Sequence, residues 1–151
     1  MKHLRPILLA EDNPNDVELI LAAFKEANFL NEIHVTRDGE EALDFLHRRG
    51  VHAGRTGLQP AVILLDLKMP KVDGREVLRQ VRADPQLRHL PVVVLTSSRE
   101  ESDLLASYQL GANAFVVKPV DFQDFITAVS RLGFFWALLN EPPPADSRPP
   151  L

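Results

Sequence analysis

Residues 61–66 read Ala61-Val62-Ile63-Leu64-Leu65-Asp66, five apolar residues that end directly on a carboxylate. Three further apolar runs also end on polar residues: 7–10 before Glu11-Asp12, 92–95 before Thr96, and 114–117 before Lys118. Short continuous apolar runs are typical of strands buried on both faces of a parallel sheet. Because the carboxyl ends of parallel strands share one sheet edge, where open α/β folds bind ligands, we expect these polar side chains to converge in one pocket.

Helical patterns separate these runs, as in chains built from strand–helix–strand units. A further strand is expected at 32–37. Helices are expected to begin after the N-cap Asn13, after Gly39, after Gly74, near residue 100 and near Asp121. Right-handed crossovers place helices on both faces of such a sheet. We therefore predict an α/β domain with a doubly wound five-stranded parallel sheet, in the order 2-1-3-4-5, and five helices.

Apolar positions at helical spacing indicate which residues of the first three helices face the core. They are Val17, Leu21, Phe24, Ala42, Leu43, Leu46, Val77, Leu78 and Val81. Residues 48–60 contain three glycines and are expected to form a flexible loop. The histidines lack the spacing of a metal site and are expected at the surface; they are His3, His34, His47, His52 and His89.

Length and composition exclude several classes of protein. A chain of 151 residues can form one domain with a sizeable core, and a net charge of −4 without a basic cluster argues against nucleic-acid binding. The absence of cysteine excludes disulfides, thiolate metal sites and cysteine catalysis. The apolar runs are too short to cross a bilayer or to act as a secretory signal, so we expect a cytoplasmic protein with no membrane partner.

Acidic residues at two neighbouring strand ends predict a metal site. Glu11 and Asp12 end the first strand, and Asp66 ends the third, which lies beside it in the predicted order. Clustered carboxylates repel one another unless a cation lies among them, and a few hard oxygen ligands suit Mg²⁺. Asp66 lies at the edge of the core, where a carboxylate can attack phosphorus and form an acyl phosphate. The alternative is an acidic helix cap beside an unrelated loop aspartate.

Lys118 and Thr96 complete this group of polar side chains. Lys118 closes a buried strand and needs a counter-charge, which the acidic cluster supplies. The hydroxyl of Thr96 can donate a hydrogen bond to a phosphoryl oxygen, whereas Ser98 is suited to cap the helix that follows.

Together, these motifs resemble the receiver domain of bacterial two-component response regulators. The matching residues are Glu11-Asp12-Asn13, Asp66 within Leu65-Asp66-Leu67-Lys68-Met69-Pro70, Asp73-Gly74, Thr96-Ser97 and Lys118-Pro119, over about residues 6–132. The resemblance implies a flavodoxin-like fold in which Asp66 accepts a phosphoryl group from a sensor histidine kinase. It implies that Asp12 binds Mg²⁺ directly and Glu11 through water. Asp66 and the backbone carbonyl of Lys68 would complete the protein ligands.

The resemblance also implies how phosphorylation would be transmitted. Thr96 and Lys118 would contact the phosphoryl group, and Phe115 would occupy the aromatic switch position, where some members have tyrosine. A switch that relies on a tyrosine hydroxyl is therefore excluded. The expected protein is a single-domain regulator, not a turnover enzyme, that catalyses only its own phosphorylation and dephosphorylation. Its output would be a protein contact or onward phosphotransfer.

A narrower resemblance links the chain to the stand-alone regulators that pair with bacteriophytochromes and cyanobacterial phytochromes. It rests on the long loop before the third strand, Ser107-Tyr108 and the aromatic segment that precedes the prolines. Past Gly133 the pattern is apolar nearly all round a helix, so we expect a homodimer interface there. Its residues are Phe134, Phe135, Trp136, Leu138 and Leu139. The expected domain covers 5–139, and the proline-rich tail at 140–151 is expected to be extended or disordered.

Other functions fit these residues less well. A haloacid-dehalogenase-type phosphatase would need a second acid two residues after Asp66, where Lys68 stands. A flavodoxin-like electron carrier shares the topology, but acids after the first strand would repel its phosphate. A receiver that acts only as a phosphorylation-independent scaffold is the remaining alternative. Such proteins usually lose the aspartate or the lysine, and this chain has both.

Overall fold

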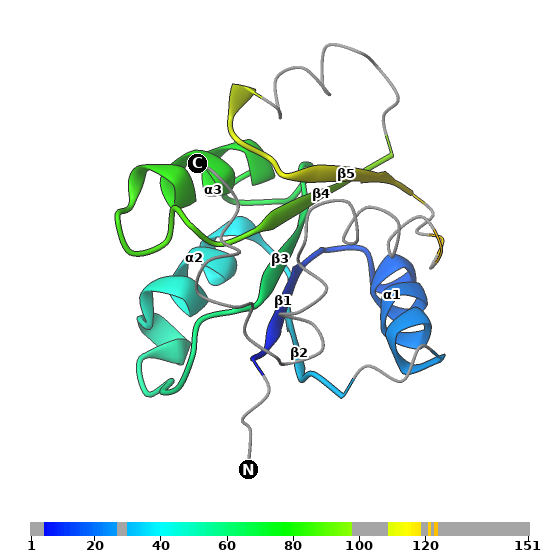
Figure 1. Cartoon of the computed structure of the whole chain (residues 1–151), viewed down its shortest axis with the longest axis horizontal. Coiled ribbons are helices and arrows are strands. Elements are labelled where there is room, and N and C mark those ends of the chain that lie inside the picture. Colours follow the sequence, from blue (N-terminus) through cyan, green and yellow to red (C-terminus); the bar gives the residue numbers. More distant parts are fainter. Residues whose placement is uncertain (1–4, 27–29, 98–108, 119–120, 122, 124–151) are drawn as a thin grey trace, which may run out of the picture.

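The computed structural model describes residues 5–26, 30–97, 109–118, 121 and 123, which form an α/β domain around a parallel sheet (Figure 1). The strands are β1 (Ile7–Ala10), β2 (Ile33–Thr36), β3 (Val62–Asp66), β4 (Val92–Thr96) and β5 (Ala114–Val117). They lie in the order β2-β1-β3-β4-β5, and every neighbouring pair is parallel. The predicted sheet and its strand order are confirmed.

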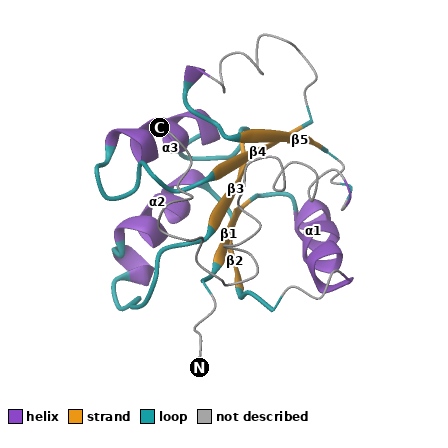
Figure 2. Cartoon of the chain, viewed as in Figure 1, coloured by secondary structure: helices purple, strands orange, loops and turns teal. Residues whose placement is uncertain are grey.

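Helices cover both faces of this sheet. Helix α1 (Pro14–Glu26) lies on one face, whereas α2 (Gly39–His47) and α3 (Gly74–Ala83) lie together on the other (Figure 1, Figure 2). The helices predicted at 100–109 and from Asp121 fall almost entirely outside the described residues, so the number of five helices stays a prediction. Within the described part of the chain, no helix is both long and apolar enough to span a membrane.

Alternate residues of each central strand face opposite sides of the sheet. In β3, Ile63 and Leu65 pack with residues of α2 and α3, whereas Val62 and Leu64 pack with residues of α1. These four side chains are at most 1% exposed. Complete burial of an aliphatic side chain contributes about 1.5–3 kcal/mol, which is why a strand covered on both faces has a continuous apolar sequence.

The described helices bury the residues that their patterns predict, with one exception in α1. There Ile20 is buried and Leu21 only partly so, which makes the buried stripe Val17, Ile20 and Phe24. Leu19, Ile20 and Leu21 are all apolar, so the sequence pattern does not decide which of them faces the sheet. In the structure, the packing of α1 on the sheet buries Ile20.

Residues 48–60 form a loop as predicted, and side chains make several contacts that hold parts of this segment. It contains a short 3₁₀ helix, η1 (Gly50–His52). Arg48 donates a hydrogen bond of 3.0 Å to the carbonyl of Arg55, and Arg55 donates one of 2.9 Å to the carbonyl of Phe45. The glycines indicated flexibility, but the long arginine side chains satisfy backbone carbonyls that would otherwise need water.

Three of the histidines lie at the surface as predicted but are only partly exposed. They are partly buried, and each has a ring nitrogen near a carboxylate oxygen. The pairs are His34 with Glu32 at 3.0 Å, His47 with Asp84 at 3.7 Å, and His52 with Glu41 at 3.6 Å. His89 is exposed as predicted, and His3 lies outside the described residues.

Candidate functional site

The three acids predicted at strand ends do lie together at the carboxyl edge of the sheet. Ala10 of β1 pairs with Leu65 of β3, so the next residues along the two strands, Glu11 and Asp66, are neighbours. Asp12 joins them, and the three residues each present a carboxylate oxygen within 4.8 Å of the others. Parallel pairing in this register therefore creates a compact set of hard oxygen ligands from residues far apart in sequence.

The acids differ sharply in exposure. Glu11 is completely buried and Asp66 is 5% exposed, whereas Asp12 is open to solvent. Burial, followed by a hydrogen bond with Asp66, raises the pKa of Glu11 to about 7. A buried carboxyl group of this kind is ionised readily only beside positive charge. The donor set thus fits a divalent cation, with Asp12 as its most accessible ligand.

Lys118 supplies positive charge to this cluster from the end of β5. Its Nζ forms ion pairs with Oε1 of Glu11, with Asp16 Oδ2 at 3.1 Å and with Asp66 Oδ2 at 3.2 Å. Burial alone would lower the pKa of the Lys118 ammonium, but the hydrogen bond to Glu11 and the charges of Asp66 and Glu11 raise it above its ordinary value. Lys118 is therefore held as a cation at the centre of the acidic cluster.

Asp16 is the site residue that the sequence reasoning did not find. It lies in the first turn of α1, where an acid interacts favourably with the positive end of the helix dipole. The N-cap Asn13 fixes the start of α1, since its Oδ1 accepts hydrogen bonds from the backbone N–H groups of Asn15 and Asp16. The available signal was spacing, because Asp16 follows Asp12 by four residues and so lies about one helical turn beyond the strand end.

Thr96 and Phe115 lie on the two strands beyond Asp66. Thr96 is the last residue of β4 and is 3% exposed, and its carbonyl accepts a hydrogen bond of 2.8 Å from the backbone N–H of Lys118. Phe115 in β5 pairs with Val94 and is partly buried against the core cluster on the side of α2 and α3. Thr96 therefore ends the strand that lies between β3, which carries Asp66, and β5, which leads into Lys118.

The turn that follows β3 is packed closely against the start of α3. Asp66 Oδ1 accepts a hydrogen bond of 3.1 Å from the backbone N–H of Lys68, and Leu67 accepts one of 2.9 Å from the N–H of Gly74. A Cβ atom on Gly74 would lie 2.1 Å from the carbonyl oxygen of Asp66. Only glycine permits this approach, so Gly74 helps to fix the backbone that carries Asp66.

The sequence matches the family described as response regulator receiver domain over residues 7–130. The chain belongs to this family. As a receiver domain it is 41% identical over 137 residues to the probable methanogenesis regulatory protein FilR2 of Methanothrix harundinacea (strain 6Ac), covering 91% of this chain and 86% of that protein.

Two solved structures are also similar to this receiver domain. The bacteriophytochrome response regulator AtBRR is 61% identical with a TM-score of 0.83, covering 92% of this chain and 99% of that one. The Mn(2+)-bound form of response regulator Rcp1 is 38% identical with a TM-score of 0.75, covering 93% and 99%. The predicted resemblance to response regulators, including those associated with phytochromes, is confirmed. The family places the chain in phosphorelay signalling rather than among phosphatases or electron carriers.

Several predicted features of the receiver domain fall outside the described residues. These are Pro119, the Ser107-Tyr108 region, the proposed interface residues Phe134, Phe135, Trp136, Leu138 and Leu139, and the tail at 140–151. The backbone N–H of Lys68 is engaged by Asp66, while the role of the Lys68 carbonyl as a metal ligand stays a prediction.

Proposed function

We propose that this receiver domain takes a phosphoryl group from a sensor histidine kinase onto Asp66. The observation that carries the proposal is the position of Asp66, whose Oδ2 is 3.2 Å from Lys118 Nζ inside the cluster formed with Glu11 and Asp12. The output is a protein contact or onward phosphotransfer, and the chain catalyses only its own phosphorylation and dephosphorylation.

The proposed reaction is a displacement at phosphorus. A carboxylate oxygen of Asp66 attacks the phosphorus of a phosphohistidine and forms the O–P bond of an acyl phosphate. The N–P bond breaks, and its electron pair returns to the imidazole nitrogen of the kinase. Buried placement favours this step because it removes water from the nucleophile and strengthens the electrostatic effect of Lys118 on the transferred oxygens.

The acidic cluster is proposed to bind Mg²⁺, with Asp12 and Asp66 as direct ligands, Glu11 through water, and the Lys68 carbonyl as the remaining protein ligand. Bound there, the ion would offset negative charge on the phosphoryl oxygens. Support comes from the three oxygens within 4.8 Å of one another and from the similar regulator Rcp1, whose structure is a Mn(2+)-bound form.

After transfer, Lys118 and Thr96 are proposed to hold the phosphoryl oxygens. Movement of Thr96 toward the phosphoryl group would leave space that the ring of Phe115 fills, which changes the surface near β5. The two conformations need to differ by only a few kcal/mol for phosphorylation to shift their populations.

The partner kinase is proposed to be a bacteriophytochrome. Support comes from the 61% identity to AtBRR, a bacteriophytochrome response regulator. Phosphotransfer from a purified bacteriophytochrome kinase, compared with an unrelated histidine kinase at equal concentration, tests the assignment. Equal or faster transfer from the unrelated kinase would contradict it. The protein is proposed to work in the cytoplasm.

We further propose that the protein is a homodimer through Phe134, Phe135, Trp136, Leu138 and Leu139, within a domain at 5–139 that precedes the tail at 140–151. Large aromatics bury about 150–250 Å² each, so three of them supply much of the roughly 800 Å² per partner of a standard interface. Sedimentation at micromolar concentration should show a dimer that truncation before Phe134 dissociates. A monomeric full-length chain, with and without a phosphoryl mimic, would end this proposal.

Intact-mass measurement after incubation with Mg²⁺ and acetyl phosphate tests the central proposal. The wild-type chain should gain one phosphoryl group, and Asp66→Asn should gain none. Full labelling of Asp66→Asn would place the acceptor elsewhere. A wild-type chain that gains no phosphoryl group from acetyl phosphate or a kinase, yet binds a partner, would favour the scaffold alternative.

A further inference from the structure

Three carboxylates share the ammonium of Lys118, and one of them belongs to α1 rather than to a strand end. A lysine ammonium has three N–H donors and no acceptor. Glu11, Asp66 and Asp16 can take all three, with Asp16 Oδ2 at 3.1 Å and Asp66 Oδ2 at 3.2 Å from Nζ. In this arrangement no donor of Lys118 is left for a phosphoryl oxygen, so at least one ion pair has to be given up when a phosphoryl group arrives.

Burial indicates which ion pair yields. The side chain of Glu11 is 0% exposed and that of Asp66 is 7% exposed, whereas that of Asp16 is 20% exposed. Removing the ammonium from Glu11 would leave a carboxylate in the interior without its counter-charge, which is costly. The carboxyl group of Asp66 itself becomes the acyl phosphate and loses its negative charge. Water can reach Asp16 and replace the ammonium there.

We propose that Asp16 is a positioning residue that competes with the phosphoryl group on Asp66 for the ammonium of Lys118 and so favours the unphosphorylated conformation. This inference rests on the proposed function of Asp66. Asp16 is well placed for the role because the Asn13 cap fixes the first turn of α1, and with it the carboxylate that holds Lys118. The position of α1 is thereby linked to phosphorylation through one side chain.

Titration with beryllofluoride, a phosphoryl mimic, tests the competition in the full chain at saturating Mg²⁺. Asp16→Asn keeps the size and polarity of the side chain but removes the charge that holds Lys118. Its affinity for beryllofluoride should rise by about fivefold, the upper range for one partly exposed ion pair. Glu18→Gln is the matched control, since Glu18 is an exposed acid of the same helix. Its affinity should equal that of the wild type.

A second measurement follows Lys118 directly and does not depend on phosphorylation. Nitrogen-detected nuclear magnetic resonance of the lysine side chains should show faster exchange of the Lys118 ammonium protons with water in Asp16→Asn than in wild type or Glu18→Gln. Unchanged exchange would show that Asp16 does not hold Lys118. An equal rise in beryllofluoride affinity for Asp16→Asn and Glu18→Gln would show a general charge effect and also overturn the inference.

These experiments distinguish an incorrect role for Asp66 from an incorrect role for Asp16. If the wild type neither binds beryllofluoride nor accepts a phosphoryl group, the proposed function is wrong and the inference falls with it. If the wild type binds the mimic and Asp16→Asn binds it with the same affinity, Asp66 keeps its role and only the competition by Asp16 is refuted.

Discussion

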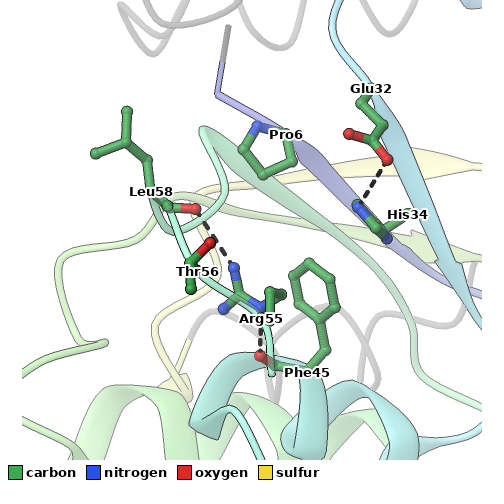
Figure 3. A pocket seen from close by; sticks show the side chains of 8 residues that line it. Pro6, Glu32, His34, Phe45, Arg55, Thr56 and Leu58 are labelled. Atoms are coloured by element: carbon green, nitrogen blue, oxygen red, sulfur yellow. Dashed lines mark hydrogen bonds and ion pairs between the residues drawn. The ribbon is translucent and has the colours of Figure 1, made fainter. Parts of the chain in front are cut away.

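The two edges of the sheet both gather charged side chains, but those charges have different partners. At the carboxyl edge, Lys118 contacts the carboxylates of Glu11, Asp16 and Asp66. At the amino edge, the guanidinium of Arg55 donates to the carbonyls of Phe45 and Leu58 (Figure 3). It also lies 4.0 Å from the centre of the Phe45 ring.

The amino edge is hollow as well as charged. A cavity of about 490 Å³ lies there, with Pro6, Glu32, His34, Phe45 and Arg55 among its lining residues (Figure 3). The volume of this cavity is in the range of small-molecule sites. However, the charged side chains that line it already contact other groups of the fold. Glu32 pairs with His34, and Arg55 bonds to backbone carbonyls.

This difference in partners indicates which charged side chains can change partners when a ligand binds. Side-chain charges that contact other side-chain charges can exchange partners when a cation or a phosphoryl group arrives. Charges that satisfy backbone carbonyls cannot leave without exposing an unpaired polar group, which costs about 1–3 kcal/mol. Substitution of Lys118 at the carboxyl edge should therefore change switching, and substitution of Arg55 at the amino edge should change stability.

The largest expected effect follows from Lys118→Ala. The variant should still bind Mg²⁺, because the acidic ligands remain, but the phosphoryl group would lose its link to β5. Hydrogen exchange of residues 109–118 should then be the same before and after addition of beryllofluoride, whereas the wild type changes. A wild-type response in Lys118→Ala would show that another group transmits phosphorylation.

The next largest effect concerns the metal. Asp12 is the exposed member of the acidic cluster, and Asp12→Ala removes one of few anionic ligands that offset dehydration of the ion. Calorimetry should show Mg²⁺ affinity lower by about tenfold or more. Glu18→Gln, which removes the charge of an exposed acid on α1, serves as the control and should leave Mg²⁺ affinity unchanged. Equal affinity in Asp12→Ala and wild type would place the metal elsewhere.

A third substitution tests the backbone packing that supports Asp66 and leaves the charged side chains of the site unchanged. Gly74→Ala would bring a Cβ atom to 2.1 Å from the Asp66 carbonyl oxygen, whereas a Cβ atom added to Gly54 would have no atom within 4 Å. Gly74→Ala should lower the free energy of unfolding by about 3 kcal/mol and slow phosphorylation, because β3 and α3 must move apart. Gly54→Ala should change stability by no more than about 0.5 kcal/mol. Denaturant unfolding and acetyl-phosphate labelling measure both, and equal stabilities would contradict the close packing.

The residues at the strand ends could be predicted from sequence because parallel pairing brings them together whatever the loops do. The grouping of Glu11, Asp12, Asp66 and Lys118 was predicted in this way, while the role of Thr96 stays a prediction. The position of Asp16 could not be found so simply, since its contact with Lys118 depends on how α1 is rotated on the sheet. The rotation of α1 on the sheet also explains why Ile20 is buried where the sequence pattern predicted Leu21.

The side-chain contacts of the loop at 48–60 could not be predicted, for a different physical reason. Glycine and turn residues indicate the local freedom of the backbone. Here, however, Arg48 bonds to the carbonyls of Arg55 and Gly57 within the segment, and Arg55 bonds to the carbonyl of Phe45 on α2. Such bonds are not periodic and leave no local pattern. The ring contacts of His34 and His52 with Phe45 could not be predicted either, because Phe45 lies on α2 and is not a neighbour of either histidine in sequence.

The smallest expected effect tests the amino edge itself, through two arginines of the same loop. Arg55 bonds to carbonyls and lies over the Phe45 ring, whereas Arg49 makes an ion pair with Asp44 at 2.7 Å and its side chain is 55% exposed. Arg55→Ala should lower the free energy of unfolding by about 2 kcal/mol, since it removes a cation–π contact and the side-chain hydrogen bonds to the carbonyls of Phe45 and Leu58. Arg49→Ala should cost less than about 1 kcal/mol, as exposed ion pairs do. Both variants should bind Mg²⁺ and accept a phosphoryl group at the wild-type rate. A slower rate in Arg55→Ala, at a temperature where it is fully folded, would show that the two edges are coupled and that the cavity beside Arg55 influences the phosphorylation site.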